Sequence, residues 1–327
     1  MSVILTGSIA YDYLMSFPGY FKDHILSEHL ESISLSFLVD EMVRQPGGVA
    51  ANVAYTLGLL CETPRLVATA GVDFAEYRKV LEDAGVDTSG VKIIEDKFTA
   101  SFFVNTDLSN AQIASFYAGA MADAGKISMK DLGLTADDLV VISPNAPDAM
   151  IQYARECQEL GVPYIFDPSQ QIVRLDEKGL KDGISGAHAL FANEYEFELL
   201  QKHTKMSAEE ILGSVDFAVV TLGENGSRVY EKGKIKAEVP VFKPENIQDP
   251  TGVGDAYRAG FLKGYLNDFR LELCAQMGAL AATYCLEETG TQTQCYLMKD
   301  FVTRFRTQFD DNGELDVLLN GASSQAL

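Results

Sequence analysis

Short apolar segments rich in β-branched residues recur along the first two thirds of the chain, separated by longer stretches of mixed polarity. Continuous apolar runs of this length are typical of strands buried on both faces of a parallel sheet. The pattern predicts six such strands, at residues 3–6, 65–70, 139–142, 164–166, 189–191 and 217–221.

The stretches between these strands carry apolar residues at three- and four-residue spacing, which favours helices packed on the faces of a sheet. Helices are predicted at residues 50–60, 76–84, 148–160, 194–201 and 208–213, and again at 254–266, 271–286 and 299–307. Strands that alternate with helices indicate an α/β fold. We therefore expect a doubly wound, mostly parallel sheet flanked by helices.

Two stretches interrupt this alternation. Residues 34–44 have no helical partner, and residues 99–105 and 111–117 resemble two strands joined by the turn-rich segment 106–110. Together they predict a small sheet outside the main one. Beside a cleft, such a sheet can act as a lid that excludes water once a ligand is bound. An extension of the edge of the main sheet is the alternative that stays open.

Composition and charge exclude several classes of protein. The 47 acidic and 26 basic residues give a net charge of -21, and the chain has no basic run of the kind that binds nucleic-acid phosphates. No apolar run reaches the roughly 18 residues of a membrane-spanning helix, and the N-terminus lacks the basic region of a secretory signal. We expect a cytoplasmic protein without nucleic-acid or membrane partners.

The segment with most chemical information is D-P-T-G-V-G-D at residues 249–255. Two glycines just before a predicted helix let backbone N–H groups converge where the helix dipole adds positive charge, which predicts an anion site. A carboxylate at Asp255 would be repelled by that anion unless it has a proton to accept. Helix capping by Asp255 is the alternative. The chain has neither a G-x-x-x-x-G-K-[ST] loop nor the third glycine of a dinucleotide fingerprint.

A second glycine cluster, G-G-V-A-A-N at residues 47–52, precedes another predicted helix. Small residues let a ligand approach the backbone closely, and the amide of Asn52 can donate and accept hydrogen bonds, which suits a vicinal diol. Asp12, just beyond the first predicted strand, would add an acceptor for hydroxyl groups.

In this order along the chain, the two glycine segments resemble the two signatures of the ribokinase-like (PfkB-type) family of carbohydrate and nucleoside kinases. An N-x-x-E motif at residues 193–196 and a T-x-G-x-x-G motif at residues 221–226 also match, and the resemblance spans residues 3 to 310. It implies a single ribokinase-like kinase domain over residues 1–327, with lid strands at about 12–46 and 95–120. Pro250 and Arg258 make the second signature more similar to that of the adenosine-kinase-like bacterial members.

The resemblance also implies roles for individual residues. Asp255 would be the general base, and the backbone of Gly252, Val253 and Gly254 would form the anion hole for the transferred phosphoryl group. The remaining positions divide between substrate binding (Asp12, Gly47, Gly48, Asn52, Phe102, Gln112 and Phe116), nucleotide binding (Asn193, Thr221, Gly223, Gly226 and Thr251) and the organisation of Mg²⁺ (Asn193 and Glu196). The implied cofactors are ATP and Mg²⁺, with K⁺ left open. The turn-like stretch at residues 288–292 would close around the nucleotide or a monovalent cation.

The implied activity is ATP-dependent phosphorylation of the 5′-hydroxyl of a nucleoside such as adenosine. An aromatic residue of the lid, Phe102, Phe103, Phe116 or Tyr117, would stack on the base, and strand alternation puts Phe102 and Phe103 on opposite faces. A kinase for a free sugar such as ribose or fructose is the alternative within the same class. A catalytically silent nucleoside-binding protein and a nicotinamide-dependent dehydrogenase are less favoured. An exposed strand edge in the lid favours a homodimer.

Overall fold

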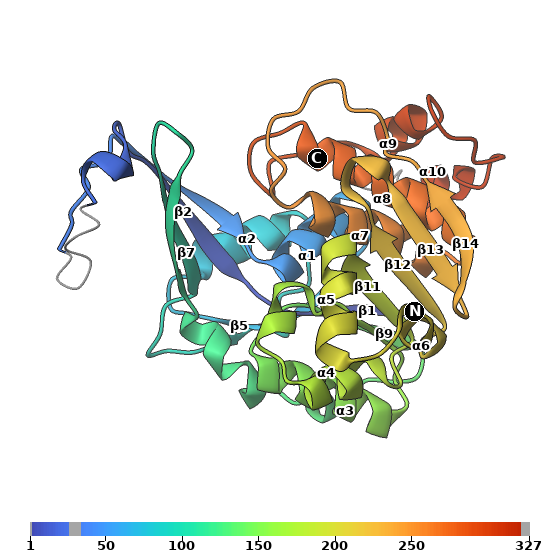
Figure 1. The fold of residues 1–327 in the computed structure, drawn as a ribbon. Coiled ribbons are helices and arrows are strands. Elements are labelled where there is room, and N and C mark those ends of the chain that lie inside the picture. Colours follow the sequence, from blue (N-terminus) through green and yellow to red (C-terminus); the bar gives the residue numbers. More distant parts are fainter. Residues whose placement is uncertain (1, 26–33, 322–327) are drawn as a thin grey trace.

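The computed structural model describes residues 2–25 and 34–321, and these residues form one large sheet, one small sheet and a two-stranded ribbon. The large sheet has the order β14-β13-β12-β11-β10-β9-β1-β4 (Figure 1). Its parallel strands are β4 (Arg65–Val67), β1 (Ser2–Thr6), β9 (Asp138–Ile142), β10 (Tyr164–Phe166), β11 (Ala189–Asn193) and β12 (Phe217–Thr221). Two antiparallel strands, β13 (Ser227–Glu231) and β14 (Lys234–Val239), complete one edge.

Helices cover both faces of the large sheet because its central strands are apolar on both sides. In β1, Val3 and Leu5 belong to one hydrophobic core and Ile4 to the other. The first core is closed by α1 (Val49–Leu59), α2 (Ala75–Asp83), α7 (Val253–Leu266), α8 (Leu271–Leu286) and α9 (Met298–Phe305). The second is closed by α3 (Pro147–Leu160), α4 (Glu177–Ile184), α5 (Glu194–Thr204) and α6 (Ala208–Gly213). A last helix, α10 (Asp316–Gly321), follows near the C-terminus.

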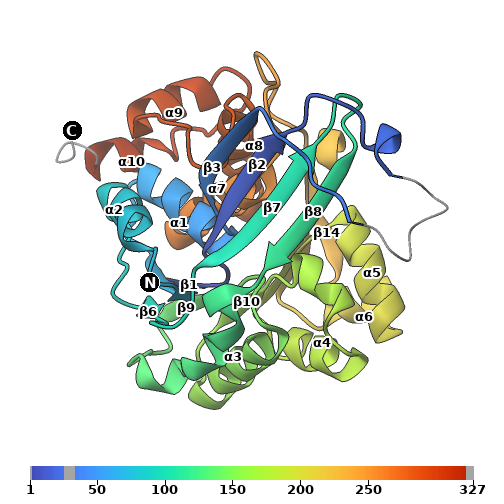
Figure 2. The same ribbon diagram turned by 90° about the vertical axis from the view of Figure 1, so that its left-hand side faces the viewer.

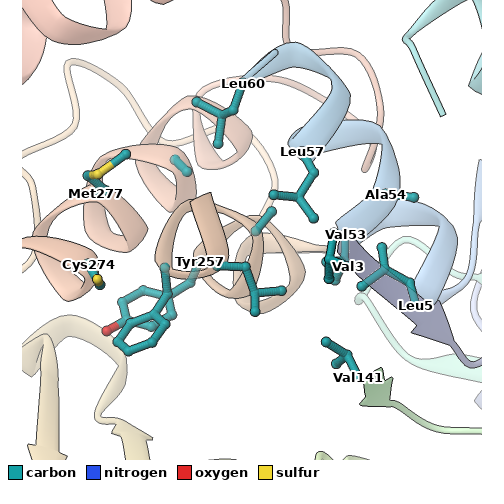
Figure 3. Packing of buried hydrophobic residues seen from close by; sticks show 14 of the residues in the cluster. Val3, Leu5, Val53, Ala54, Leu57, Leu60, Val141, Tyr257, Cys274 and Met277 are labelled. Carbon is teal, nitrogen blue, oxygen red and sulfur yellow. The ribbon is translucent and has the colours of Figure 1, made fainter. Parts of the chain in front are cut away.

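Helices α1 and α7 are neighbours in the first core, although about 200 residues separate them. Val53 of α1 lies beside Val3 of β1, and Leu57 of the same helix points toward α7 (Figure 3). This packing fixes the two helices that follow the glycine clusters side by side against the sheet.

The small sheet has the order β3-β2-β7-β8, formed by β3 (Glu41–Gly47), β2 (Ala10–Ser16), β7 (Ala100–Thr106) and β8 (Gln112–Tyr117). Figure 2 shows it in front of the body of the molecule, separate from the large sheet. The predicted fold class, with its additional small sheet, is confirmed. The alternative that these strands extend an edge of the large sheet is wrong.

Several element boundaries differ from the sequence prediction. The strand expected at residues 65–70 divides into β4 and β5 (Thr69–Ala70), and β5 pairs with β6 (Lys92–Ile93) in the ribbon. The strand expected at residues 34–44 begins only at residue 41, and residues 26–33 of the expected lid range lie outside the described part. Asp12 lies within β2 and not beyond a strand end. Strands β13 and β14 were missed because polar residues interrupt them at the sheet edge.

Short 3₁₀ turns connect several elements: η1 (Phe21–Asp23), η3 (Gly119–Lys126), η4 (Met129–Asp131), η5 (Ser169–Val173) and η6 (Gly223–Asn225). Within the described part of the chain, none of the helices has the length and apolar character needed to cross a membrane.

Candidate active site

The carboxyl ends of β1, β9 and β10 meet at a cavity of about 410 Å³, where ligands of open parallel sheets generally bind. The cavity also receives residues from the small sheet and from the N-termini of α1 and α7. Its lining residues are Ser8, Ala10, Asp12, Gly48, Val49, Asn52, Phe102, Phe116, Met121, Pro144, Gln170, Gln171, Arg174, Thr251, Gly252, Asp255 and Thr291.

Helices α1 and α7 both begin at the cavity. Each follows a glycine whose backbone conformation other residues rarely adopt. Gly48 precedes α1 with φ +96°, and a Cβ there would lie 2.6 Å from the carbonyl oxygen of Ser8. Gly252 precedes α7 with φ +77°, and a Cβ there would lie 2.8 Å from Thr291. The glycines therefore allow the close approach that brings the N-termini of both helices to one cavity.

Asp255 is the third residue of α7, and its side chain is 13% exposed. Its Oδ2 accepts a hydrogen bond of 2.8 Å from Nδ2 of Asn52, and its Oδ1 lies 3.8 Å from Nη1 of Arg258. Burial raises the pKa of the Asp255 carboxyl, while Arg258 and Asn52 oppose that rise. Among the described residues no side chain, that of Asp255 included, caps α7, so helix capping does not explain this carboxylate.

The amide of Asn52 is held in one orientation by its neighbours. Nε2 of Gln292 donates to Oδ1 of Asn52 at 2.8 Å and to the hydroxyl of Tyr77 at 2.5 Å. The Tyr77 hydroxyl in turn donates to the carbonyl oxygen of Gly47. Asn52 therefore presents its N–H group to Asp255, and the stretch at residues 288–292 contributes Gln292 to this chain of hydrogen bonds.

The small sheet contributes three side chains that lie in one row across its strands. Asp12 pairs with Phe102, and Phe102 pairs with Phe116, and all three line the cavity. Phe103 lies on the other face, where its ring stacks on Tyr13 with centroids 4.6 Å apart. The prediction that Phe102 and Phe103 face opposite ways is confirmed. Gln112 does not line the cavity, since it pairs with Thr106, four residues or about 13 Å farther along β8.

Asp12 lies directly above the first glycine cluster. A Cβ on Gly47 would lie 2.5 Å from Oδ2 of Asp12, so the carboxylate occupies space that only a glycine leaves free. Burial, with a further contribution from the nearby Asp255 carboxylate, raises the pKa of Asp12 to about 6. Both effects disfavour the charged form of the side chain.

The N-x-x-E and T-x-G-x-x-G motifs lie at the ends of two neighbouring strands. Asn193 ends β11 and Thr221 ends β12, and the two residues are paired in register. Gly223 and Gly226 form the turn after β12, where a Cβ on Gly226 would lie 2.0 Å from a backbone oxygen of β14. These residues lie outside the cavity lining, unlike Thr251, which is part of it.

Asn193 and Glu196 form a capping box at the start of α5. Oδ1 of Asn193 accepts from the N–H of Glu196, and Oε2 of Glu196 accepts from the N–H of Asn193, both at 2.8 Å. Oε1 of Glu196 accepts from the hydroxyl of Ser169. The three-residue spacing between Asn193 and Glu196 thus has a local structural reason.

The donor set allows a water-mediated role for Glu196 toward Mg²⁺. The described residues contain no group of three or more His, Cys, Asp or Glu side chains that could hold a metal directly. Mg²⁺ generally keeps several waters and binds through one or two carboxylates together with substrate phosphates. Each carboxylate oxygen of Glu196 accepts one hydrogen bond from the protein, so each keeps a lone pair for a water.

Sequence reasoning missed three lining residues that follow β10, namely Gln170, Gln171 and Arg174. Gln171 is 5% exposed, and its Oε1 has no hydrogen-bond partner among the described residues. The exposed Arg174 is a cation of the cavity lining. Their position after the carboxyl end of a predicted parallel strand was the signal that could have found them.

Comparisons with known proteins place these features in a wider context. The model of the pfkB family of carbohydrate kinases matches residues 22–297. The chain is 30% identical over 315 residues to a nucleoside kinase of Methanothermobacter thermautotrophicus, covering 94% of this chain and 96% of that protein. It is 31% identical over 249 residues to a nucleoside kinase of Methanocaldococcus jannaschii, covering 76% and 81%. The structure of the Burkholderia thailandensis nucleoside kinase in complex with inosine superposes with a TM-score of 0.82 at 33% identity, covering 94% of this chain and 98% of that one.

Proposed function

Because the chain belongs to the pfkB family of carbohydrate kinases, and is thereby an ATP-dependent kinase for a nucleoside or a sugar, we propose that it phosphorylates the primary 5′-hydroxyl of a nucleoside. Adenosine is the first acceptor to consider from the sequence resemblance, and inosine is a second, since it is bound to the Burkholderia thailandensis nucleoside kinase.

The observation that supports a nucleoside is the pair of phenylalanines in the cavity. Phe102 and Phe116 are direct cross-strand neighbours that line the same cavity as Asp12 and Asp255. A base that stacks on an aromatic ring gains about 1–3 kcal/mol, whereas a free sugar has no flat apolar face of this size to place there. One part of the cavity thus suits a base and the other suits hydroxyl groups.

In this proposal Asp255 is the general base that takes the proton of the attacking hydroxyl. Gly252 at the start of α7 lines the same cavity, and the backbone N–H groups of Gly252, Val253 and Gly254 would bind the oxygens of the transferred phosphoryl group. Placement of these donors beside the base provides in-line positioning and charge stabilisation, which are the main requirements of phosphoryl transfer.

Ribose hydroxyl groups would meet acceptors and donors from two sides of the cavity. The sequence predicts this role for Asp12, for the backbone at Gly47 and Gly48, and for Asn52. Gln171 joins them, because its buried and unpartnered Oε1 is an acceptor for a hydroxyl group. Gln112 has no part in this proposal, since it lies at the far end of β8.

The nucleotide would bind next to the ends of β11 and β12, bordered by Asn193, Thr221, Gly223 and Gly226, with Thr251 at the junction of the two sites. Glu196 would hold Mg²⁺ through water. The ion would neutralise charge on the transferring phosphates.

We also propose a homodimer formed through the small sheet. All six residues of β8 are exposed, and β8 is an edge strand of that sheet. Unpaired edges of this kind are generally covered by another chain or element.

An acceptor panel tests the choice of substrate. Purified protein is assayed with ATP and Mg²⁺ against adenosine, inosine, cytidine, ribose and fructose, and the variants Phe102→Ala and Phe103→Ala are run beside it. We expect turnover on nucleosides, with KM for the nucleoside raised about ten-fold or more in Phe102→Ala because stacking on the cavity face is lost.

Phe103→Ala is the matched control, because the same residue type is removed from the same strand on the face away from the cavity. Its KM should stay close to that of the wild type. Turnover on ribose or fructose alone, or equal effects of the two variants, would contradict the nucleoside proposal.

A further inference from the structure

Arg258 lies one turn beyond the proposed base on α7, and its side chain folds back toward the start of the helix. Nη1 of Arg258 lies 3.8 Å from Oδ1 of Asp255. It also lies 2.9 Å from the position that a Cβ on Gly254 would take. The missing side chain at Gly254 therefore leaves the space into which the guanidinium group reaches.

Asp167 anchors this guanidinium group from the large sheet. It is the first residue after β10 and its side chain is fully buried. Nη2 of Arg258 donates to Oδ1 of Asp167 at 2.9 Å, and Nε lies 2.5 Å from Oδ2. One hydrogen bond and one ion-pair contact to the same carboxylate therefore hold the guanidinium group against Asp167. The Arg258 side chain, itself only 12% exposed, is thus held between the two aspartates.

Three further carboxylates interact electrostatically with Asp255: Asp12 of β2, Glu196 of α5 and Asp167 at the end of β10. Arg258 is the cation closest to Asp255 in the described part of the chain, and Arg174, the residue after η5, lines the same cavity without an ion pair to it. A carboxylate among like charges and largely out of water tends to bind a proton, and a protonated Asp255 could not act as a base.

We propose that Arg258, anchored by Asp167, is a positioning residue that keeps the Asp255 carboxylate ionised and directed into the cavity. This inference rests on the proposed function, since it gives Arg258 its role through the base. Arg258 itself keeps its charge: burial lowers its pKa, but Asp167 and Asp255 more than offset this, and the net shift is upward. The proton from the hydroxyl is therefore taken by Asp255, and the guanidinium group acts only through its charge and its fixed position.

The test compares Arg258→Gln and Arg258→Lys with the wild type. The double variant Asp167→Asn/Arg258→Gln is made as well, because it removes both buried charges together and avoids a lone buried carboxylate. The matched control is Arg304→Gln, which breaks another largely buried ion pair, that of Arg304 with Glu287, away from the cavity.

Two readouts are needed. The first is the titration of the Asp255 carboxyl carbon by ¹³C NMR without substrate, assigned by its loss in Asp255→Asn. The second is the pH at which kcat/KM reaches half of its maximum on the acidic side of its pH profile. In Arg258→Gln both should move up by about one pH unit or more, because an opposite charge within 4–6 Å lowers a carboxyl pKa by about 1–3 units. The double variant should show a smaller upward shift, because it also removes the like charge of Asp167. Arg258→Lys should restore most of the shift, and Arg304→Gln should leave both readouts in place.

An unchanged carboxyl titration in Arg258→Gln, or in the double variant should the single one not fold, would overturn the inference whatever the activity. If Arg258 had a purely structural role, its replacement would lower the thermal stability but leave the pKa of the Asp255 carboxyl unchanged. If the pKa of the Asp255 carboxyl rose while the pH dependence of kcat/KM stayed the same, the role of Asp255 as base would instead be overturned. The two failures are thereby distinguishable.

Discussion

At the residue scale, the two aspartates of the cavity differ in what surrounds them. Asp255 accepts a hydrogen bond from Asn52 and faces Arg258, so its ionised form has direct support. Burial raises the pKa of both carboxyls, but the charge of Asp255 adds to the rise at Asp12, which lies over Gly47, whereas Arg258 and Asn52 oppose the rise at Asp255. This difference suits Asp255 as the residue that must be charged before reaction, and it makes Asp12 a group whose charge opposes folding.

The Asp255→Asn variant tests the proposed base. The amide keeps the shape of the side chain but cannot take a proton, so kcat should fall by about 10²–10⁴ while KM for the nucleoside changes little. Steady-state kinetics measure both values. Asp216→Asn is the control, because that exposed aspartate pairs with His188 outside the cavity and should leave activity unchanged. Wild-type turnover in Asp255→Asn would rule out the proposed role.

The Asp12→Asn variant tests the cost of charge in the cavity. The pKa of Asp12 is raised in the folded protein to about 6, so its favourable contribution to stability exists below its unfolded pKa and is lost as pH rises to 6 and above. Asp12→Asn should therefore raise the melting temperature relative to the wild type at pH 8, change it little at pH 4, and raise KM for the nucleoside.

Asp87→Asn is the control of opposite sign. Burial alone would raise the pKa of Asp87, but the hydrogen bonds from Ser89 lower it overall. The favourable contribution of the Asp87 carboxylate to stability is therefore present at pH 8 and lost in acid. Removal of that charge should lower the melting temperature at pH 8. If Asp12→Asn also destabilised the protein at pH 8, the raised pKa of Asp12 would be contradicted.

At the scale of single elements, the first turns of three helices carry the main polar side chains of the proposed site. The first turns of α1 and α7 deliver Asn52 and Asp255 to the cavity, and the first turn of α5 holds Glu196. Helix α6 begins with the same capping-box arrangement, made by Ser207 and Glu210, but away from the cavity. Because α5 and α6 share the capping box, a change made at the same position of each helix distinguishes an effect on helix capping from an effect on ligand binding.

The Glu196→Gln variant uses this comparison to test the proposed contact with Mg²⁺. A glutamine can still close the capping box, so the helix should keep its stability, but the negative charge toward the ion is lost. The Mg²⁺ concentration for half-maximal activity at fixed ATP should rise several-fold. Removal of the divalent cation by chelation should abolish turnover in both proteins.

Glu210→Gln makes the matching change in α6 and should leave the Mg²⁺ dependence unchanged. Equal Mg²⁺ curves for Glu196→Gln and the wild type would leave Glu196 with a capping role alone.

At the scale of the whole molecule, the small sheet and the body close one cavity between them. The sheet supplies Asp12, Phe102 and Phe116 from one face, and its other face carries Phe103 and the exposed Tyr117. Bound nucleoside would contact both parts at once. Such a ligand should hold the sheet against the body and restrict its motion.

Limited proteolysis with and without nucleoside tests this closure. Cleavage within residues 99–117 should slow markedly at saturating nucleoside, because the ligand links β7 and β8 to the body. Cleavage in the hairpin of β13 and β14 is the internal control and should not change, since that hairpin belongs to the large sheet and contributes no residue to the cavity lining. Equal cleavage of β7 and β8 under both conditions would count against a mobile lid.

Local features of the chain were enough to predict much of this protein. Apolar runs located the central strands because each run is buried on both faces, and the spacing of glycines located both helix starts because only glycine tolerates the required backbone angles and contacts. The position of Asp255 in the first turn of α7 follows from the same local rules. Strands β13 and β14 were not predicted, because charged residues interrupt the apolar pattern of both strands, and most residues of the edge strand β14 are exposed.

The tertiary structure alone decided which of these pieces meet. The order of the strands brings Asp167 to Arg258, and Gln292 to Asn52, across 91 and 240 positions of the sequence. It also selects Phe102 over Phe103 for the cavity, because the pairing of β7 with β2 determines which face of the strand looks inward. Contacts between distant residues depend on how complete elements pack, and no local pattern of side chains carries that information.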